Sequence, residues 1–397
     1  MADDLGYECL GAYGGTSYRT PVLDKLAVEG VRFDHCYSQP LCTPSRVQLM
    51  TGQYNVRNYT RFGELDPGQT TFARLLKQAG YVACVVGKWQ LAGGADAPQR
   101  FGFDEHCLWL LTRKPGHYPN PGLEINGKFV KYTHGEYGPD IVSDYACDFM
   151  QRHKDQPFCL YYPMLLPHCP FEPTPDSADW DPQSKGSPTY KGDPKYFGDM
   201  VAYMDKTVGK VLAKLDALGL RDNTLVIFTS DNGTDEPVVS KMGDKEIAGG
   251  KGRTTDAGTH VPLIARYPAS GAKSRVCADL VDTSDILPTV CQFAGVTVPA
   301  KLPIDGQSFL PQIRGEKGKP REWTYCWYLR KDSKLREYAR NHRYKLYRDS
   351  RFFDISADPL EQSPLAESAL TEEALAACTM LQDVLDKYAQ VRRPSAK

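Results

Sequence analysis

The sequence alternates between short apolar runs and amphipathic helical segments for most of its length, and this alternation restricts the chain to an α/β fold. Thr224–Thr229 is a mainly apolar run, and Tyr196–Leu218 before it carries apolar residues at helical spacing. Tyr137–His153 and Phe158–Met164 repeat the helix-then-strand order. Strands that alternate with helices in this way predict a largely parallel sheet covered by helices on both faces.

The pattern of predicted helices and strands divides the chain into two parts. In the first part we expect further helices and strands at Thr20–Gly30, Thr70–Ala79, Val82–Val86, His260–Arg266 and Thr283–Phe293. Residues 314–322 are polar and rich in helix breakers, which predicts a linker. Short aromatic strands and a final helix follow it, near Trp323–Leu329, Arg336–Arg340, Tyr344–Tyr347 and Thr371–Val391. We therefore predict a large domain over 1–313 and a smaller antiparallel sheet with one helix over 323–397.

The composition is that of an ordinary soluble protein. The 397 residues are 41% hydrophobic and 24% charged, with a net charge of −1. A charge this close to zero argues against nucleic acid or an anionic membrane as a partner. The apolar runs are all shorter than a membrane span requires.

One short stretch has the properties of an anion-handling site. Pro40-Leu41-Cys42-Thr43-Pro44-Ser45-Arg46 leads into an apolar helical stripe that ends at Gly52. Thr43 is a suitable N-cap, and proline is favoured at the first helical position. Cys42 is therefore expected just before the positive end of a helix, where free N–H groups and the helix dipole favour negative charge.

Polar residues follow several of the predicted strands. Asp3-Asp4 lies at the start of the chain, and Ser230-Asp231-Asn232-Gly233 comes directly after the strand Thr224–Thr229. Three carboxylates and one amide oxygen form a set of oxygen ligands that suits a hard cation. Four cationic or titratable side chains stand at comparable places, namely Arg46, Lys88, His168 and Lys251.

These motifs resemble the type I sulfatases, whose signature Cys-x-Pro-Ser-Arg matches Cys42 to Arg46. The resemblance covers nearly the whole chain and implies an alkaline-phosphatase-like α/β fold, a large mixed sheet flanked by helices with a smaller C-terminal subdomain. It implies that Cys42 is converted to Cα-formylglycine by a formylglycine-generating or anaerobic sulfatase-maturating enzyme. It also implies one Ca²⁺ held by Asp3, Asp4, Asp231, Asn232 and the modified Cys42. Magnesium is the alternative, and the larger number of protein ligands favours calcium.

The resemblance also implies roles for the remaining residues. Arg46 would stabilise the hydrated formylglycine as the nucleophile, and Asp231 would orient it. Lys88 and Lys251 would stabilise charge on the sulfate oxygens, and His168 with Lys251 would protonate the departing alcohol oxygen. Loss of a proton from the second hydroxyl would then expel sulfate and restore the aldehyde.

One residue departs from the family pattern. After Lys88-Trp89 the family has histidine, which is assigned to the second hydroxyl of the nucleophile, and this chain has Gln90. Glutamine can hold a hydroxyl by hydrogen bonding and cannot act as a base near neutral pH. We interpret Gln90 as a positioning residue, so that the regeneration step uses another group or water.

The predicted activity is hydrolysis of sulfate monoesters, on sulfated carbohydrates or aryl sulfates. Two alternatives remain: a phosphate or phosphonate monoester hydrolase with the same nucleophile, and a glycan-binding pseudo-sulfatase. Five residues of the C-terminal part are candidates for a sugar subsite, namely Trp327, Tyr328, Arg330, Arg336 and Tyr338.

The start of the sequence is unusual for this family. Asp3-Asp4 follows Met1-Ala2 directly, whereas an apolar strand precedes the equivalent pair in sulfatases. We therefore expect that the first strand and an export signal are missing from the sequence, and that the enzyme is periplasmic or extracellular.

Overall fold

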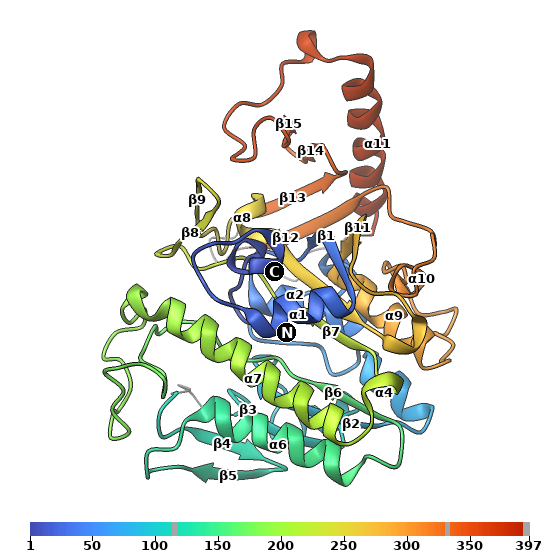
Figure 1. Cartoon of the computed structure of the whole chain (residues 1–397). Coiled ribbons are helices and arrows are strands. Elements are labelled where there is room, and N and C mark those ends of the chain that lie inside the picture. The colour runs from blue at the N-terminus through green and yellow to red at the C-terminus, as the bar shows by residue number, and fades with distance from the viewer. Residues whose placement is uncertain (113–117, 330–333, 392–397) are drawn as a thin grey trace.

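The computed structural model describes residues 1–112, 118–329 and 334–391 (Figure 1). Within these residues, one sheet has the strand order β5-β4-β3-β2-β6. Its strands are β2 (Val82–Lys88), β3 (Glu105–Trp109), β4 (Gly122–Ile125), β5 (Lys128–Lys131) and β6 (Phe158–Tyr161). β2 is parallel to both β3 and β6, while β4 and β5 form an antiparallel extension at the far edge.

A second sheet has the order β11-β1-β10-β7. Its strands are β1 (Val31–Tyr37), β7 (Val226–Thr229), β10 (His260–Arg266) and β11 (Arg275–Asp282). β1 is parallel to β11, but β10 is antiparallel to both β1 and β7. The expectation of a largely parallel sheet is therefore wrong for this part, because β10 enters the sheet without a helical crossover after the short α8 (Asp256–Thr259).

Helices cover both faces of these sheets (Figure 1). One apolar core includes side chains from α1 (Pro21–Glu29), α6 (Gly138–Arg152) and α7 (Phe197–Ala217). A second apolar core includes side chains from four other helices, namely α2 (Cys42–Thr51), α4 (Phe72–Gln78), α9 (Ile286–Phe293) and α10 (Leu310–Ile313). The helices predicted from apolar spacing are confirmed, with ends shifted by a few residues.

The first two residues of the chain lie between the facing edges of the two sheets. Ala2 forms a parallel bridge with Ser230, and its N–H donates to the carbonyl of Thr229 at 2.8 Å. On the other side, the N–H of Met164 donates to the carbonyl of Met1 at 2.8 Å. Next to Met1, a cavity of about 700 Å³ lies between the side chains of β6 and β7. Asp3 and Asp4 therefore emerge at the ends of two strands from different sheets.

The C-terminal part contains a separate antiparallel sheet (Figure 1). Its strands are β12 (Thr324–Leu329), β13 (Leu335–Arg340), β14 (Tyr344–Tyr347) and β15 (Phe352–Asp354), in sequential order. The helix α11 (Glu372–Ala389) packs on one face of it, with Leu381 and Leu385 against Tyr325 and Leu346. The antiparallel sheet with one helix is therefore confirmed. The described chain also contains smaller elements, among them α3 (Asn55–Asn58), α5 (Ala97–Arg100), β8 (Val239–Met242) and β9 (Lys245–Ala248).

The stretch 314–322 lies between α10 and β12, and its C-terminal end is anchored in the core. The side chain of Arg321 is 2% exposed and forms a buried ion pair with Asp285, with 2.7 Å from Nε to Oδ2. Its guanidinium also donates to the hydroxyl of Tyr54 and to the carbonyl of Asp305. The division of the chain into domains at this stretch stays a prediction.

Within the described residues, each helix falls short of the length or the apolar character needed to cross a bilayer.

The Arg321–Asp285 pair makes a testable prediction for stability. Removing one partner of a buried pair leaves an uncompensated charge, so Arg321→Ala is expected to lower the free energy of unfolding by about 3 kcal/mol or more. Urea denaturation followed by circular dichroism measures the change. Lys319→Ala, at an exposed position of the same stretch, is the matched control and should change the free energy by less than about 0.5 kcal/mol. Equal stability of the two variants would contradict the anchoring role of Arg321.

Candidate active site

Cys42 is the first residue of α2, and its side chain is buried. Leu41 is the N-cap, because its carbonyl accepts the N–H of Ser45 at 3.2 Å. The prediction of Thr43 as N-cap is therefore wrong: the hydroxyl of Thr43 instead accepts the N–H of Gly63 at 3.0 Å. Pro44 lies in the first turn, where its missing N–H costs no helical hydrogen bond. The predicted end of the helix at Gly52 is confirmed, with the left-handed φ of 66° that favours glycine.

Asp3 and Asp4 meet the segment after β7. The N–H of Asp4 donates to Oδ1 of Asp231 at 3.1 Å, and Nδ2 of Asn232 donates to Oδ1 of Asp4 at 2.8 Å. Asp4 has a left-handed backbone with φ of 64°. This conformation interrupts the alternation of side chains between the two faces of an extended chain. All four polar residues are fully buried. The sequence prediction that these two segments converge is therefore confirmed in their geometry.

Arg46 connects three segments of the chain. Its guanidinium donates to Oδ2 of Asp231 at 2.9 Å, to Oδ2 of Asp3 at 3.1 Å and to the carbonyl of Lys88 at 2.8 Å. The ammonium of Lys88 lies 2.6 Å from the same Oδ2 of Asp3. Arg46 and Lys88 are both 1% exposed, so the pairs are shielded from solvent and bind strongly.

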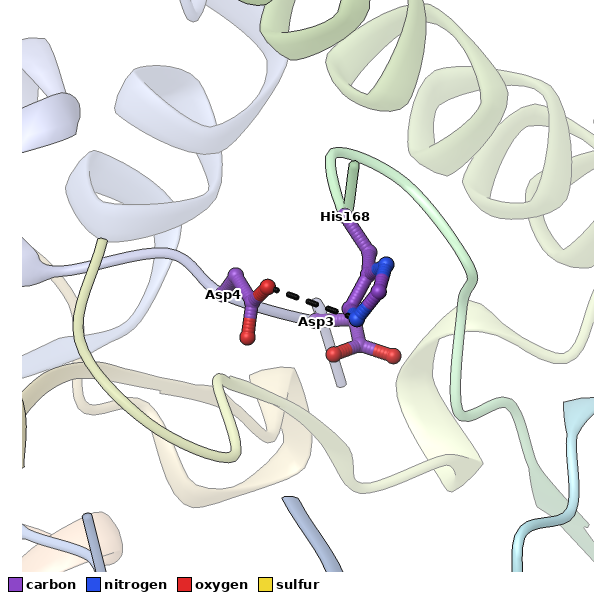
Figure 2. Close-up of side chains that lie close together, drawn as sticks. All are labelled: Asp3, Asp4 and His168. Atoms are coloured by element: carbon purple, nitrogen blue, oxygen red, sulfur yellow. Dashed lines mark ion pairs between the residues drawn. The ribbon is translucent and has the colours of Figure 1, made fainter. Parts of the chain in front are cut away.

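His168 and Lys251 both lie next to the carboxylate of Asp4. Nε2 of His168 lies 3.6 Å from Oδ2 of Asp4, and Figure 2 shows the imidazole facing that carboxylate. The ammonium of Lys251 donates to the same Oδ2. The loop of Lys251 needs glycine at position 250, because a Cβ there would lie 2.6 Å from the backbone of Ala257.

The buried charges shift the pKa values of the cluster. Burial and the nearby Asp3 raise the pKa of Asp231 to about 7, against the effect of Arg46. Burial, Lys88 and Lys251 lower the pKa of His168 to about 4, so its imidazole is neutral in this arrangement. Burial disfavours the charge on Lys251, but Asp4 reverses this and holds its pKa well above the ordinary value. Burial raises the pKa of the Cys42 thiol, so the unmodified cysteine is a poor nucleophile near neutral pH.

Several of these side chains have the spacing of metal ligands. Ligand atoms of Asp3, Cys42 and Asp231 all lie within 4.8 Å of one another, as do those of Asp3, Asp4 and His168. Oδ1 of Asp3 and Oδ1 of Asn232 are buried without a hydrogen-bond partner in the described part of the chain. Two buried oxygens without donors, beside further carboxylates, fit a hard cation.

Gln90 follows β2 and has a left-handed backbone with φ of 52°. Its Oε1 is buried and has no hydrogen-bond partner among the residues that the structure describes. An amide oxygen in this state is available to accept a hydrogen bond from a hydroxyl group.

Sequence reasoning missed Tyr190, an aromatic residue beside His168. Tyr190 is exposed, and its ring centroid lies 6.5 Å from that of His168. Its surroundings in sequence are polar and carry no motif that could have identified it. Among the predicted subsite residues, Tyr338 is buried, with the ammonium of Lys345 3.9 Å from its ring centroid, and its part in a sugar subsite stays a prediction. Arg330 lies outside the described residues.

The other three subsite candidates lie on β12 and β13. Tyr328 is buried. If Gly252, next to Lys251, carried a Cβ atom, that atom would lie 4.0 Å from the hydroxyl of Tyr328. Trp327 is half-buried against Tyr59, with 6.2 Å between ring centroids. Arg336 is also half-buried. Their part in a sugar subsite stays a prediction.

Comparison with known proteins identifies the family. Residues 1–296 match the family model described as Sulfatase, and residues 251–389 match that of the C-terminal region of N-sulphoglucosamine sulphohydrolase. The first match spans most of the chain. The chain therefore belongs to the sulfatase family, the enzymes that hydrolyse sulfate esters.

Individual relatives agree with this assignment. Arylsulfatase A of Bos taurus is 31% identical over 399 residues, which cover 90% of this chain and 76% of the relative. N-acetylglucosamine-6-O-sulfatase of Bacteroides thetaiotaomicron is 28% identical over 469 residues, covering 91% of this chain and 81% of the relative. The crystal structure of Ps i-CgsB in complex with k-i-k-neocarrahexaose superposes with a TM-score of 0.83 at 27% identity, covering 100% of this chain and 93% of that chain. The predicted alkaline-phosphatase-like sulfatase fold is confirmed.

Proposed function

We propose that this sulfatase cleaves sulfate monoesters with Cys42 as the site of the nucleophile, after conversion of Cys42 to Cα-formylglycine by a maturating enzyme. The observation that carries the proposal is the burial of Cys42 at the start of α2, in one cluster with Asp3 and Asp231. An unmodified thiol has a raised pKa at this position, which gives the unconverted residue no advantage as a nucleophile. The formylglycine hydrate would supply a hydroxyl nucleophile and a second hydroxyl that allows sulfate to leave.

We propose one Ca²⁺ as the cofactor, held by Asp3, Asp4, Asp231, Asn232 and the modified Cys42. The unpartnered oxygens of Asp3 and Asn232 support this ligand set. When bound, the ion would supply positive charge for the nucleophile and for a sulfate oxygen. Calcium is favoured over magnesium, because it accepts many protein oxygens in a flexible geometry.

The cations of the cluster suit the charge of a sulfate ester. Arg46 is held between Asp3 and Asp231, so it would keep Asp231 oriented toward the nucleophile. Lys88 is paired with Asp3, and Lys251 is paired with Asp4. Fixed ammonium groups of this kind stabilise negative charge on the oxygens of a transferring group.

His168 is proposed to protonate the departing alcohol oxygen together with Lys251. Its Nδ1 is bonded to the carbonyl of Cys169, which fixes the ring and directs Nε2 toward the cluster. Burial and the neighbouring cations Lys88 and Lys251 keep its pKa low, at about 4. A negatively charged ester beside the imidazole would raise that pKa and favour the protonated form that the step requires.

The proposed substrate is a sulfated carbohydrate or an aryl sulfate. Both classes occur in the names of the relatives reported above, one an N-acetylglucosamine-6-O-sulfatase and one an arylsulfatase. An exported location, periplasmic or extracellular, stays a prediction.

The first prediction tests the reaction and its nucleophile. The purified enzyme is expected to cleave 4-nitrophenyl sulfate faster than the corresponding phosphate or phenylphosphonate ester. Mass spectrometry of the peptide that contains Cys42 should show CHO in place of CH₂SH in the active fraction. Cys42→Ala should reduce kcat by about 10³-fold or more, as expected for loss of a covalent nucleophile. A higher rate on the phosphonate ester would overturn the choice of sulfate.

The second prediction concerns the metal. Removal of Ca²⁺ with a chelator should lower the melting temperature, and Ca²⁺ at about 100 times its dissociation constant should restore about 2.7 kcal/mol of stability. Asn232→Ala should weaken this calcium response, whereas Asn223→Ala, at an exposed position, should leave it unchanged. Differential scanning calorimetry gives the readout. A melting temperature that is insensitive to calcium in the unaltered protein would contradict the proposed site.

The third prediction concerns Gln90. As a positioning residue it should tolerate histidine, so Gln90→His is expected to change kcat by less than about tenfold, while Gln90→Ala loses about tenfold or more. The exposed Gln78→Ala serves as the control. The pH profile of kcat decides the role: a large gain for Gln90→His with a new ionisation near neutral pH would show that glutamine is a handicap.

A further inference from the structure

Among the charged side chains of the cluster, those of His168 and Lys251 are the most exposed to solvent. Asp3, Asp4 and Asp231 have fully buried side chains, and those of Arg46 and Lys88 are 1% exposed. The side chains of His168 and Lys251 are each 12% exposed. Substrate therefore has to reach the cluster past these last two residues.

Tyr190 stands at this opening. Its side chain is 69% exposed, and its ring meets the imidazole of His168 edge to face, with 6.5 Å between centroids and 82° between planes. Partial burial of its hydroxyl and the nearby Cys169 raise the pKa of Tyr190, which also responds to the charges of Lys251 and Asp4. The ring of Tyr190 therefore lies beside the imidazole of His168 and leaves most of its surface open to solvent.

The position of Tyr190 is fixed by its neighbours. The carbonyl of Lys191 accepts the N–H of Phe171 at 2.8 Å, close after the segment that carries His168. The ammonium of Lys191 lies 2.6 Å from Oδ2 of the buried Asp235. Asp235 follows Thr234, whose carbonyl accepts the N–H of Lys251 at 3.0 Å. The chain next to Tyr190 is thus connected to the segments of both proposed proton-donating residues, which places the ring close to them.

We propose that Tyr190 is a specificity-determining residue, and that its ring stacks against the sugar or aryl ring that bears the sulfate ester. The inference rests on the proposed function, in which His168 and Lys251 act on the departing oxygen. The group bonded to that oxygen must lie on their side of the sulfur atom, where Tyr190 is exposed. The face of an aromatic ring binds the apolar face of another ring by dispersion and burial of apolar area.

The test compares esters with and without a ring. Tyr190→Ala should lower kcat/KM by about tenfold for 4-nitrophenyl sulfate and N-acetylglucosamine 6-sulfate, mainly through KM, while ethyl sulfate changes by less than about twofold. Tyr190→Phe keeps the ring and should remain within about threefold of the unaltered enzyme for all three esters. The control is Phe129→Ala, another partly exposed aromatic residue, on β5 at the far edge of its sheet.

The outcomes separate this inference from the proposed function. A loss with only one of the ringed esters supports stacking and identifies the kind of ring. An equal loss with ethyl sulfate, or no loss with either ringed ester, would overturn the role of Tyr190. If the unaltered enzyme cleaves none of the sulfates, the proposed function fails. The role of Tyr190 is then tested by measuring, with calorimetry, how tightly the Cys42→Ala protein binds the ringed esters. Binding that weakens about tenfold on adding Tyr190→Ala supports the inference, and unchanged or undetectable binding refutes it.

Discussion

The buried guanidinium of Arg46 is the interaction on which the rest of the site depends. It bonds Asp3 at the start of the chain, Asp231 after β7 and the backbone carbonyl of Lys88 at the end of β2. These partners belong to both sheets, so one side chain sets the relative position of the two sheet edges. A charge buried this deeply is stable only when its donors are paired, and the planar fork of arginine fixes the direction of each partner. Lysine at position 46 could not satisfy the three partners in the same plane.

The charge of the cluster depends on Asp231. Asp3 and Asp4 are paired with Arg46, Lys88 and Lys251, whereas burial and the nearby Asp3 raise the pKa of Asp231 to about 7. Asp231 can therefore hold a proton near neutral pH, and a cation bound beside it would favour its ionised form. The positive charge that the three cations supply suits an anionic ester and the charge that develops on oxygen during its cleavage.

Part of this site could be predicted from sequence, because some of its polar residues follow recognisable apolar strands. Asp231 and Asn232 come directly after β7, and Lys88 ends β2, so the carboxyl ends of strands from the two sheets carry these residues. The antiparallel direction of β10 could not be predicted, since its apolar pattern is the same in either direction. The N-cap of α2 was assigned to Thr43 from propensity, but a tertiary contact with Gly63 engages that hydroxyl. Tyr190 was missed because only the folded path of 171–193 brings it to His168.

Burial divides the site into a rigid interior and an accessible rim. Residues proposed for the nucleophile and the metal lie inside, where every displacement would disturb several charge pairs. Tyr190 lies outside this network, and the Lys191–Asp235 pair beside it connects its segment to the loop of Lys251. A change of ring-binding residue at this rim would alter substrate preference without moving Asp3, Arg46 or Asp231. The fold thereby separates the chemistry that a sulfate ester requires from the surface that distinguishes one alcohol from another.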